Sequence, residues 1–276
     1  MNDFAHNVAR LRKKLGLTQE ALAGKLNLSF QAVSKWENAQ SSPDITLLPD
    51  LACALETDID SLLGYLPKKK QITAYEQRYR TKEYYWGVEP QTMCYDVLRL
   101  RPPTKPLHLL DVGCGEGKDA VFFAKNGYIV SAFDASSHGI EKANLLAQKH
   151  NVDVNFFTAD LREFRLDHTF DIIYSSGVLH YLPPDIRNDV LRDYQTHTPK
   201  NGIHALNVFV DKPFIPLPPD EELSELTWKS GELFTCYANW CFHTCDERIF
   251  DCKSNGTPHR HCMDVLIAEN PDRRLV

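Results

Sequence analysis

The chain has 276 residues, 43% of them hydrophobic and 25% charged, which is enough apolar material for a sizeable buried core. No apolar stretch approaches the roughly 18 residues of a membrane span, and residues 1–15 lack an apolar signal-peptide core. We therefore expect a cytoplasmic protein with no membrane partner. The formal net charge of −6 argues against nucleic-acid binding by the chain as a whole.

Cysteine is unevenly distributed along the chain. Five of the eight cysteines lie between Cys236 and Cys262, in a stretch that also holds His243, His259 and His261. Without a secretory signal, a disulfide framework is the less expected use of these residues, so most are predicted to be free thiols. The C-terminal end is therefore rich in soft donor atoms.

Apolar spacing predicts helices at the start of the chain. Phe4 and Val8 begin a helical pattern that Gly16 ends. Thr18 is a predicted N-cap of the next helix, and Asn27 suits the left-handed position of a tight turn. Because the first 40 residues hold six basic side chains and only three acidic ones, a local positive face is expected there.

A third helix is predicted to begin at Ser29, which can cap it. Val33 and Trp36 should face inward, which leaves hydrogen-bonding side chains, those of Gln31, Ser34 and Lys35, on the outer side. Two short helices joined by a tight turn, with such a surface on the second, are what reading the DNA major groove requires.

Residues 11–64 resemble the phage-repressor-like helix-turn-helix family of the xenobiotic-response-element type, in the run GLTQEALAGKLNLSFQAVSKWENAQSSPD and the closing LACALETDIDSLLG. The resemblance implies an all-α five-helix domain that binds a double-stranded DNA operator, with Gln19 and Asn38 contacting phosphates. The implied DNA-binding residues are Gln19, Ser29, Gln31, Ser34, Lys35 and Asn38. The alternative is a helical bundle that has lost DNA binding and serves only for dimerisation.

A domain boundary is expected after Gly64, where a proline and three lysines follow one another. We assign residues 1–66 to the helix-turn-helix domain, 67–80 to a linker and 81–276 to a second domain. The aromatic-rich stretch AYEQRYRTKEYYWGVEPQ is too apolar for a free linker and should lie against the second domain.

The second domain contains a glycine-rich turn between a predicted strand at 107–112 and a helical stretch at 118–126. Its pattern, Asp111-x-Gly113-Cys114-Gly115-x-Gly117, differs from the Gly-x-Gly-x-x-Gly of dinucleotide folds and resembles the first motif of class I S-adenosylmethionine-dependent methyltransferases. Glycines allow close approach of a ligand to the backbone, and the following helix N-terminus offers free N–H groups. A nicotinamide cofactor remains the minor alternative.

Further strands at 129–133, 154–158 and 170–175 alternate with helical segments, which predicts a parallel sheet. Asp134 ends one strand, where a carboxylate can accept both ribose hydroxyls. The resemblance implies an α/β Rossmann-like fold with seven strands, the last one antiparallel. The implied cofactor-binding residues are the glycine motif with Asp111 and Cys114, then Asp134, Ala135, Asp160, Leu161 and Ser176.

After a strand at 203–210, a hairpin is predicted from strands at 244–251 and 259–268 around Ser254-Asn255-Gly256. The alternative for these motifs is a Rossmann-like domain with a dead or different nucleotide pocket.

Within the methyltransferases, the chain resembles the tellurite-resistance and thiopurine-type small-molecule enzymes, in the segment from Tyr84 to Pro90, the glycine motif, and Gly231-Glu-Leu233. The resemblance implies that the Tyr84 segment caps the cofactor pocket, with Tyr84 or Trp86 near the methionine end, although both could be core aromatics. A basic pair of the tellurite enzymes is not evident here, which puts tellurite in doubt as the substrate.

The acceptor site is open to several interpretations. His180, with Tyr181 behind it, could act as a base after the fourth strand. Cys252, His259 and His261 could meet one ligand across the hairpin, either a soft metal or metalloid or a thiol, or they could be separate surface histidines and a buried cysteine. No resident metal is predicted.

We expect a methyltransferase that converts S-adenosyl-L-methionine to S-adenosyl-L-homocysteine and methylates a small acceptor, soft in character. A homodimeric DNA-binding domain would couple this chemistry to transcription. The alternative is a regulator whose second domain senses the cofactor or a toxic ligand without turnover.

Overall fold

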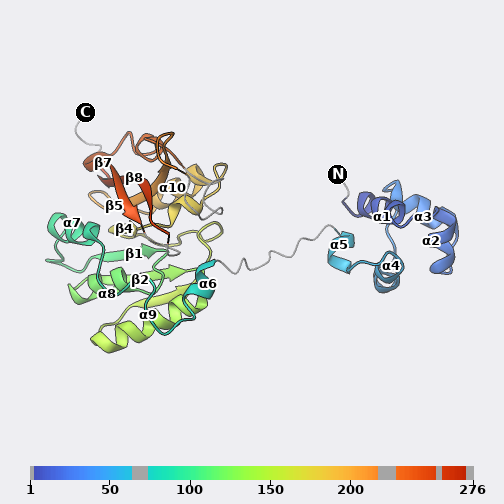
Figure 1. The fold of residues 1–276 in the computed structure, drawn as a ribbon, viewed down its shortest axis with the longest axis horizontal. Helices are drawn as coiled ribbons and strands as arrows, with labels where there is room; N and C mark the ends of the chain where they lie inside the picture. The colour runs from blue at the N-terminus through green and yellow to red at the C-terminus, as the bar shows by residue number, and fades with distance from the viewer. Residues whose placement is uncertain (1–2, 64–73, 217–227, 253–256, 272–276) are drawn as a thin grey trace. The chain divides into compact units, whose positions relative to one another are not determined.

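The computed structural model describes residues 3–63, 74–216, 228–252 and 257–271. The chain divides into two compact units, Met1–Gln71 and Ile72–Val276, each with its own hydrophobic core (Figure 1). Helix α6, Ala74–Arg78, falls within the predicted linker at 67–80 but belongs to the second unit. Its aromatic neighbours pack there, as the apolar composition of the segment predicts.

The first unit is mainly helical. Its helices are α1 Asp3–Lys14, α2 Gln19–Lys25, α3 Phe30–Glu37, a 3-10 turn at Ile45–Leu47, α4 Leu48–Ala54 and α5 Ile59–Leu63. Thr18 caps α2 by accepting a hydrogen bond from the Ala21 amide at 3.1 Å, and Asn27 has the left-handed φ of 54°. Val33 and Trp36 are buried as predicted. Ser29 occupies the N-cap position of α3 but makes no capping hydrogen bond with its side chain.

The second unit is built on a mixed sheet. Its strands are β1 His108–Val112, β2 Ile129–Asp134, β3 Asn155–Thr158, β4 Ile172–Ser175, β5 Ile203–Asp211, β6 Trp228–Lys229, β7 Cys241–Cys252 and β8 His259–Glu269. The order is β3-β2-β1-β4-β5-β8-β7, with β6 beside β5. Strands β1 to β5 are parallel, and β8 runs antiparallel to β5. In the described residues the sheet thus has eight strands, one more than expected, because the two-residue β6 adds to the end of β5.

Helices cover both faces of this sheet (Figure 1). They are α6, α7 Thr92–Leu100, α8 Lys118–Lys125, α9 Ser137–His150, α10 Arg187–Thr196 and α11 Glu232–Thr235, with a 3-10 turn at Leu179–Tyr181. One core packs α7, α8 and α9 against the sheet, and the other packs α10 and α11. The alternating strands and helices bring the carboxyl ends of β1, β2, β4 and β5 to one edge, where α/β folds bind ligands.

The hairpin of β7 and β8 pairs Cys252 with His259. The predicted turn Ser254-Asn255-Gly256 lies outside the described residues. Strand β7 begins at Cys241 rather than residue 244, and an irregularity between Phe242 and Thr244 shifts its register. Its side chains are mostly exposed, so no alternation of apolar and polar residues marks the start of this strand.

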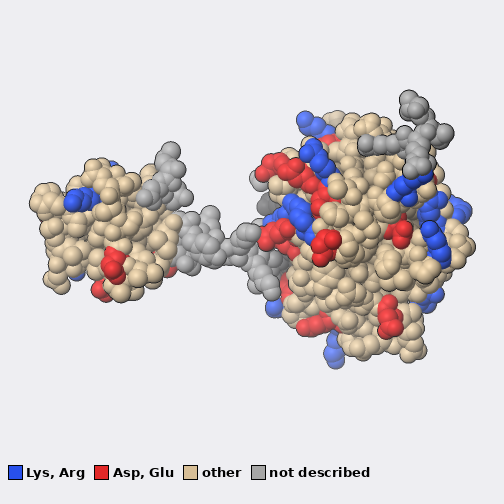
Figure 2. Space-filling model, turned by 180° about the vertical axis from the view of Figure 1, so that it is seen from behind, with Lys and Arg blue, Asp and Glu red and all other residues tan. Residues whose placement is uncertain are grey.

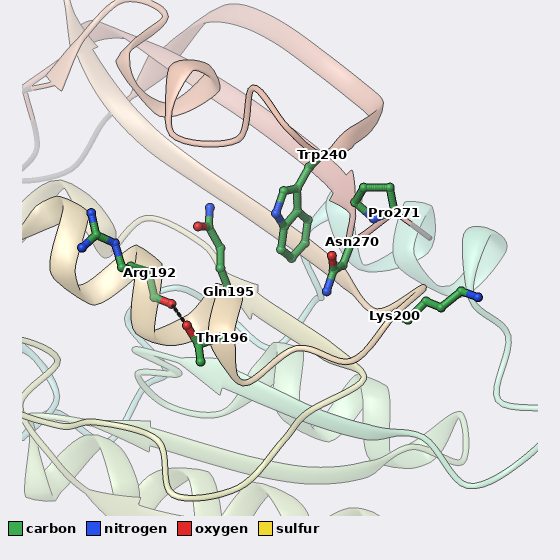
Figure 3. Close-up of a pocket in the computed structure, with 7 residues that line it drawn as sticks. All are labelled: Arg192, Gln195, Thr196, Lys200, Trp240, Asn270 and Pro271. Atoms are coloured by element: carbon green, nitrogen blue, oxygen red, sulfur yellow. Dashed lines mark hydrogen bonds between the residues drawn. The ribbon is translucent and has the colours of Figure 1, made fainter. Parts of the chain in front are cut away.

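The surface of the second unit carries both signs of charge, interspersed over the face seen in Figure 2. An open pocket of about 490 Å³ lies between Arg192, Lys200, Trp240 and Asn270 (Figure 3). Since Lys200 precedes β5 and Asn270 follows β8, this pocket lies at the amino edge of the parallel strands, opposite the glycine-rich turn. Among the described helices, none has the length and apolar character needed to cross a membrane.

Candidate functional site

The glycine-rich turn links β1 to α8 at the carboxyl edge of the sheet. The amides of Gly113 and Cys114 donate to the carbonyl of Phe133 at 2.8 and 2.9 Å, which holds the turn against β2. The amide of Gly115 donates to Asp134 Oδ2 at 2.9 Å. The turn and the acidic end of β2 are therefore one hydrogen-bonded unit, as expected of a nucleotide-type site.

Glycine is required at this turn by packing as well as by backbone conformation. Gly113 has φ of 72°, and a Cβ there would lie 2.4 Å from the side chain of Val178. Gly115 has φ of 54°, and a Cβ there would lie 2.8 Å from Tyr79 Oη. Both contacts are too short for a Cβ atom, so glycine at these positions lets the turn pack closely under Val178 and Tyr79.

The carboxylate of Asp134 is held in place by backbone hydrogen bonds. Its Oδ1 accepts from the Ser136 amide at 2.8 Å, and its Oδ2 accepts from Gly115. Burial raises the pKa of Asp134, while these backbone hydrogen bonds oppose the rise. A carboxylate has about four acceptor positions, so Asp134 keeps acceptor capacity for a ribose hydroxyl beside its backbone hydrogen bonds.

A second carboxylate, that of Asp111, is buried beneath the turn. Burial raises its pKa well above the ordinary value, and within the described residues its Oδ2 has no hydrogen-bond partner. The neighbouring Asp119 is satisfied, since it accepts from the Gln91 amide at 2.9 Å and from Tyr174 Oη at 2.8 Å. A positively charged ligand bound nearby, such as a methyl sulfonium, would favour the ionised form of Asp111 and lower its pKa.

The ends of β3 and β4 hold the remaining residues predicted to bind a cofactor. Asp160 forms an ion pair with Arg162, whose Nε lies 2.9 Å from Oδ1, and Leu161 packs half-buried against the core. Ser176 Oγ accepts from Asn207 Nδ2 at 3.1 Å, and Asn207 Oδ1 accepts from the amide of Gly177 at 2.7 Å. Sequence reasoning missed Asn207, although a polar residue inside an apolar strand is a signal that could have found it.

Within residues 74–79, Tyr79 lies on the turn and Glu76 lies at the start of α9, and sequence reasoning did not place them there. Glu76 accepts hydrogen bonds from the hydroxyls of Ser136 and Ser137 and contacts the His138 ring, at the start of α9. Burial alone would raise the pKa of Glu76, but these contacts lower it to about 2. With Tyr79 against Gly115, this segment, which we call the lid segment, covers the glycine-rich turn.

Aromatic rings continue the lid segment. The ring centroid of Tyr75 lies 5.7 Å from that of Tyr79, 6.1 Å from that of Trp86 and 6.3 Å from that of Tyr181. Trp86 and Tyr181 thus belong to the same cluster near the turn. Tyr84 does not, because its hydroxyl donates to the carbonyl of Lys142 at 3.2 Å and its ring packs on the hydrophobic cluster of α8 and α9.

His180, the predicted base, is buried and stacks on Phe209 at 4.4 Å between centroids. Within the described residues neither ring nitrogen has a hydrogen-bond partner, and burial lowers its pKa to about 3. A general base works best when its pKa lies near the working pH, so this imidazole is poorly suited to deprotonating an acceptor. The sequence does not reveal this burial.

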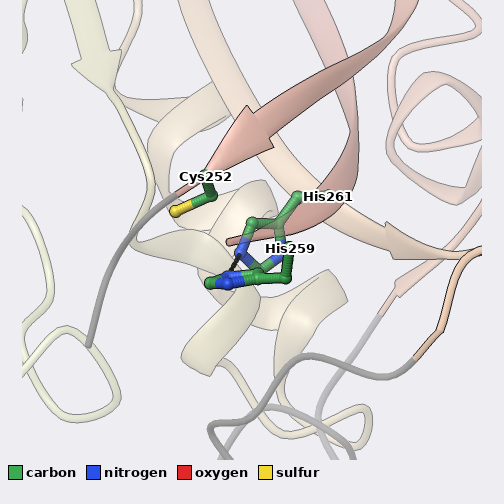
Figure 4. A group of neighbouring side chains, drawn as sticks. All are labelled: Cys252, His259 and His261. Atoms are coloured by element: carbon green, nitrogen blue, oxygen red, sulfur yellow. Dashed lines mark hydrogen bonds between the residues drawn. The ribbon is translucent and has the colours of Figure 1, made fainter. Parts of the chain in front are cut away.

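The structure brings Cys252, His259 and His261 together on one face of the β7–β8 hairpin (Figure 4). Their potential ligand atoms all lie within 4.8 Å of one another. Cys252 pairs directly with His259, and His261 lies two residues along the same strand. Val210 at the end of β5 pairs with Cys262, so this cluster is at the carboxyl edge as well.

In the first unit, α3 presents the predicted DNA-reading surface. Gln31 and Lys35 are exposed, Ser34 is half-buried and Ser29 is exposed at the start of the helix. Asn38 ends α3, where its side-chain amide donates to the carbonyl of Ser34 at 2.9 Å. Gln31 and Lys35 thus point outward as the sequence predicts, whereas Ser34 is partly covered.

A buried ion pair between Arg12 and Glu37 links α1 to the end of α3. Arg12 Nε and Nη2 donate to the two carboxylate oxygens of Glu37 at 2.6 and 2.8 Å, and Gln19 Nε2 donates to Glu37 Oε2 at 2.9 Å. Burial acts to raise the pKa of Glu37, but the hydrogen bonds from Arg12 and Gln19 lower it overall. Arg12 is consequently part of the core and not of the expected positive face.

Two protein families match the chain, one within each unit. Residues 77–257 match the family described as tellurite resistance protein TehB. The chain belongs to this family. Residues 8–62 match a helix-turn-helix family, so the TehB-type unit follows a helix-turn-helix unit, as predicted.

Similarity to individual TehB relatives is moderate. The "Probable S-adenosyl-L-methionine-dependent methyltransferase TehB" of Haemophilus influenzae strain 10810 is 24% identical over 196 residues, which cover 71% of this chain and 64% of the relative. A "Ubiquinone biosynthesis O-methyltransferase" of Rickettsia prowazekii is 34% identical over 101 residues, 37% of this chain and 39% of that protein. The crystal structure of TehB from Haemophilus influenzae has a TM-score of 0.59 at 20% identity and covers 73% of this chain and 67% of that one, which supports the fold.

Proposed function

We propose that this chain is an S-adenosylmethionine-dependent methyltransferase for a small, soft acceptor, joined to a sequence-specific DNA-binding domain. One observation carries the first half of this proposal. The Gly115 amide donates a hydrogen bond to the Asp134 carboxylate. This bond joins the glycine-rich turn to the group that would accept the ribose hydroxyls. The names of the TehB relatives, which state dependence on S-adenosyl-L-methionine, support the choice of cofactor.

Within that site, each end of the cofactor has candidate partners. Gly113, Gly115 and Gly117 would face the methionine part, with the acidic Asp111 beneath, and Asp134 with Ala135 would hold the ribose. Asp160 and Leu161 at the end of β3 would lie beside the adenine. When bound, S-adenosylmethionine supplies a methyl group on a positively charged sulfur.

The acceptor class is inferred from the burial of His180, the base that the sequence predicts. An alcohol or ammonium acceptor must lose a proton, but His180, with a pKa of about 3, is a weak base. A thiolate already carries the lone pair that forms the new bond to the methyl carbon as the donor carbon–sulfur bond breaks. The protein then mainly needs to hold the two reactants in line, which favours a soft acceptor.

The first unit supports the DNA-binding half of the proposal. We take residues 1–66 as a five-helix DNA-reading domain, with Gln31, Ser34 and Lys35 contacting bases and Gln19 and Asn38 contacting phosphates. A single small module seldom supplies enough contacts for specific affinity, so a homodimer on a palindromic operator is expected.

A second candidate is a regulator that senses the cofactor without turnover, and the lid segment favours it. This segment directly follows the chain that leads from the DNA-binding unit, and Tyr79 already lies on Gly115. A ligand at the turn would press on Tyr79 and, through it, on α6 at the start of the second unit. The same contact would couple catalysis to transcription if turnover occurs.

Calorimetric titration of the full chain with S-adenosylmethionine tests the part common to both candidates. We expect saturable binding of one cofactor per chain, and the absence of binding would overturn both. Formation of S-adenosylhomocysteine with small thiols, selenite or tellurite then separates enzyme from sensor. Small amines serve as the hard-acceptor comparison.

A further inference from the structure

We propose that Cys252, His259 and His261 bind one soft divalent metal ion of the zinc class. The hairpin itself assembles the three donors. Cys252 and His259 are directly paired across β7 and β8, and His261 points to the same side as His259 because side chains alternate along a strand. Neither the family match nor the proposed methyl transfer requires such an ion.

The distances between the donor atoms suit a single ion. Zinc binds imidazole nitrogen at about 2.0–2.1 Å and thiolate sulfur at about 2.3 Å, so tetrahedral ligands lie roughly 3.4–3.6 Å apart. The two Nε2 atoms are 2.8 Å apart, and all three donors are within 4.8 Å. Small side-chain rotations on a fixed pair of strands would equalise these distances.

The hydrogen bonds of His259 orient it as a ligand. Its Nδ1 lies 2.7 Å from the carbonyl oxygen of Thr257, which can only accept, so Nδ1 carries the proton. In the neutral ring, Nε2 then has a lone pair directed at His261 Nε2. A backbone carbonyl holding the second nitrogen of a metal-bound histidine is the usual arrangement around zinc. When an ion binds, His261 changes tautomer: the proton between the two Nε2 atoms moves to Nδ1 of His261, and each Nε2 then offers a lone pair to the ion.

The surroundings favour an open site. His261 is buried, while Cys252 and His259 are half-buried, so an ion can enter from one side. Three protein ligands leave a fourth position for an external ligand, as in catalytic zinc sites. The ring of Phe209 stacks on His261 at 4.7 Å and on His180 at 4.4 Å, which connects this position to the acceptor side. Only this last step, that the open position faces the acceptor, rests on the proposed function.

Metal binding can be measured on the full chain without cofactor or acceptor. Reduced, metal-free protein is titrated with Zn²⁺ by calorimetry, and Co²⁺ is added separately to record the absorption of a tetrahedral, thiolate-bound ion. We expect one equivalent per chain, with affinity at least tenfold weaker in Cys252→Ser and in His261→Ala. Matched controls on β7 are Cys245→Ser and His243→Ala, which alter an exposed cysteine and an exposed histidine outside the cluster.

Absence of saturable binding, or equal affinity in the control and cluster variants, would overturn the proposal. Because His261 is buried, thermal unfolding of each variant shows whether it folds, and His259→Ala at a half-buried position provides a second ligand deletion. S-adenosylmethionine titrations of the same variants keep the two proposals separate. Metal binding without cofactor binding would support this site and overturn the proposed function. Cofactor binding without metal binding would overturn this site and support the proposed function.

Discussion

Asp134 shows how one carboxylate both builds the turn and remains available to a ligand. Two backbone amides, those of Gly115 and Ser136, hold its oxygens at 2.9 and 2.8 Å, so its orientation is set before any ligand arrives. A preoriented acceptor loses little entropy on binding, which strengthens each hydrogen bond that it makes to a ribose.

We predict that Asp134→Ala weakens S-adenosylmethionine binding by at least about 100-fold, since hydrogen bonds to a charged acceptor contribute about 1.5–3 kcal/mol each. Calorimetric titration of the full chain measures this change. Asp153→Ala removes an exposed carboxylate elsewhere in the same unit and should bind like the wild type. Unchanged affinity in a folded Asp134→Ala protein would refute the assignment.

In the helix-turn-helix unit, Glu37 is likewise a carboxylate held by several hydrogen bonds. Its folded-state pKa is lowered, so the stability that it contributes is fully present above the unfolded pKa of about 4.3 and is lost as the pH falls through the lower folded-state value. Glu37→Gln leaves Arg12 without its buried partner, which should cost about 3 kcal/mol at neutral pH.

Chemical unfolding of residues 1–66 at pH 7 and below pH 4 tests this expectation. The difference in stability between wild type and Glu37→Gln should shrink in acid, because protonation removes the same charge. A difference that stays constant with pH would show that the ion pair does not stabilise the unit.

At the scale of elements, helix α3 combines a buried face with an outward one. Val33 and Trp36 fix α3 against the core, so Gln31 and Lys35 have a defined direction. Bidentate contacts of such side chains to adenine and guanine each contribute about 1–3 kcal/mol of discrimination.

Replacing both Gln31 and Lys35 by alanine should therefore relax sequence preference, with affinity for the best operator approaching that for random DNA. Selection of binding sites from a random pool, followed by titration, measures this change. Lys25→Ala, at an exposed lysine of α2, should weaken binding to all sequences about equally. A preference that survives the double substitution would mean that α3 is not the reading helix.

Elements with a strong local pattern could be predicted well from the sequence. The helix predicted at 118–126 and the strand predicted at 129–133 agree with the structure to within a residue, since Gly117 and Gly127 bound the helix and Gly127 precedes the strand. The pairing of Cys252 with His259 also follows from local spacing around the hairpin.

Features set by tertiary packing could not be predicted. No local pattern places Tyr79 on Gly115, because that contact joins segments 36 residues apart in the sequence. The lowered pKa of His180 results from burial beside Phe209, which its position after β4 does not reveal. The two-residue β6 forms only because β5 lies beside it.

At the scale of the whole molecule, each of the two units has its own hydrophobic core. We predict that the full chain binds a palindromic operator as a dimer, because two reading helices are needed for specific affinity. Sedimentation of the protein–DNA complex gives the stoichiometry. A single chain on a specific operator would contradict the prediction.

The central claim is that the second unit transfers a methyl group to a soft acceptor. The most direct test measures S-adenosylhomocysteine formed by the full chain with small thiols, selenite, tellurite and small amines, beside the Asp134→Ala protein. We predict turnover with at least one soft acceptor, little with amines at neutral pH, and none in the variant. Cofactor binding without S-adenosylhomocysteine from any acceptor, or a preference for amines, would contradict the claim.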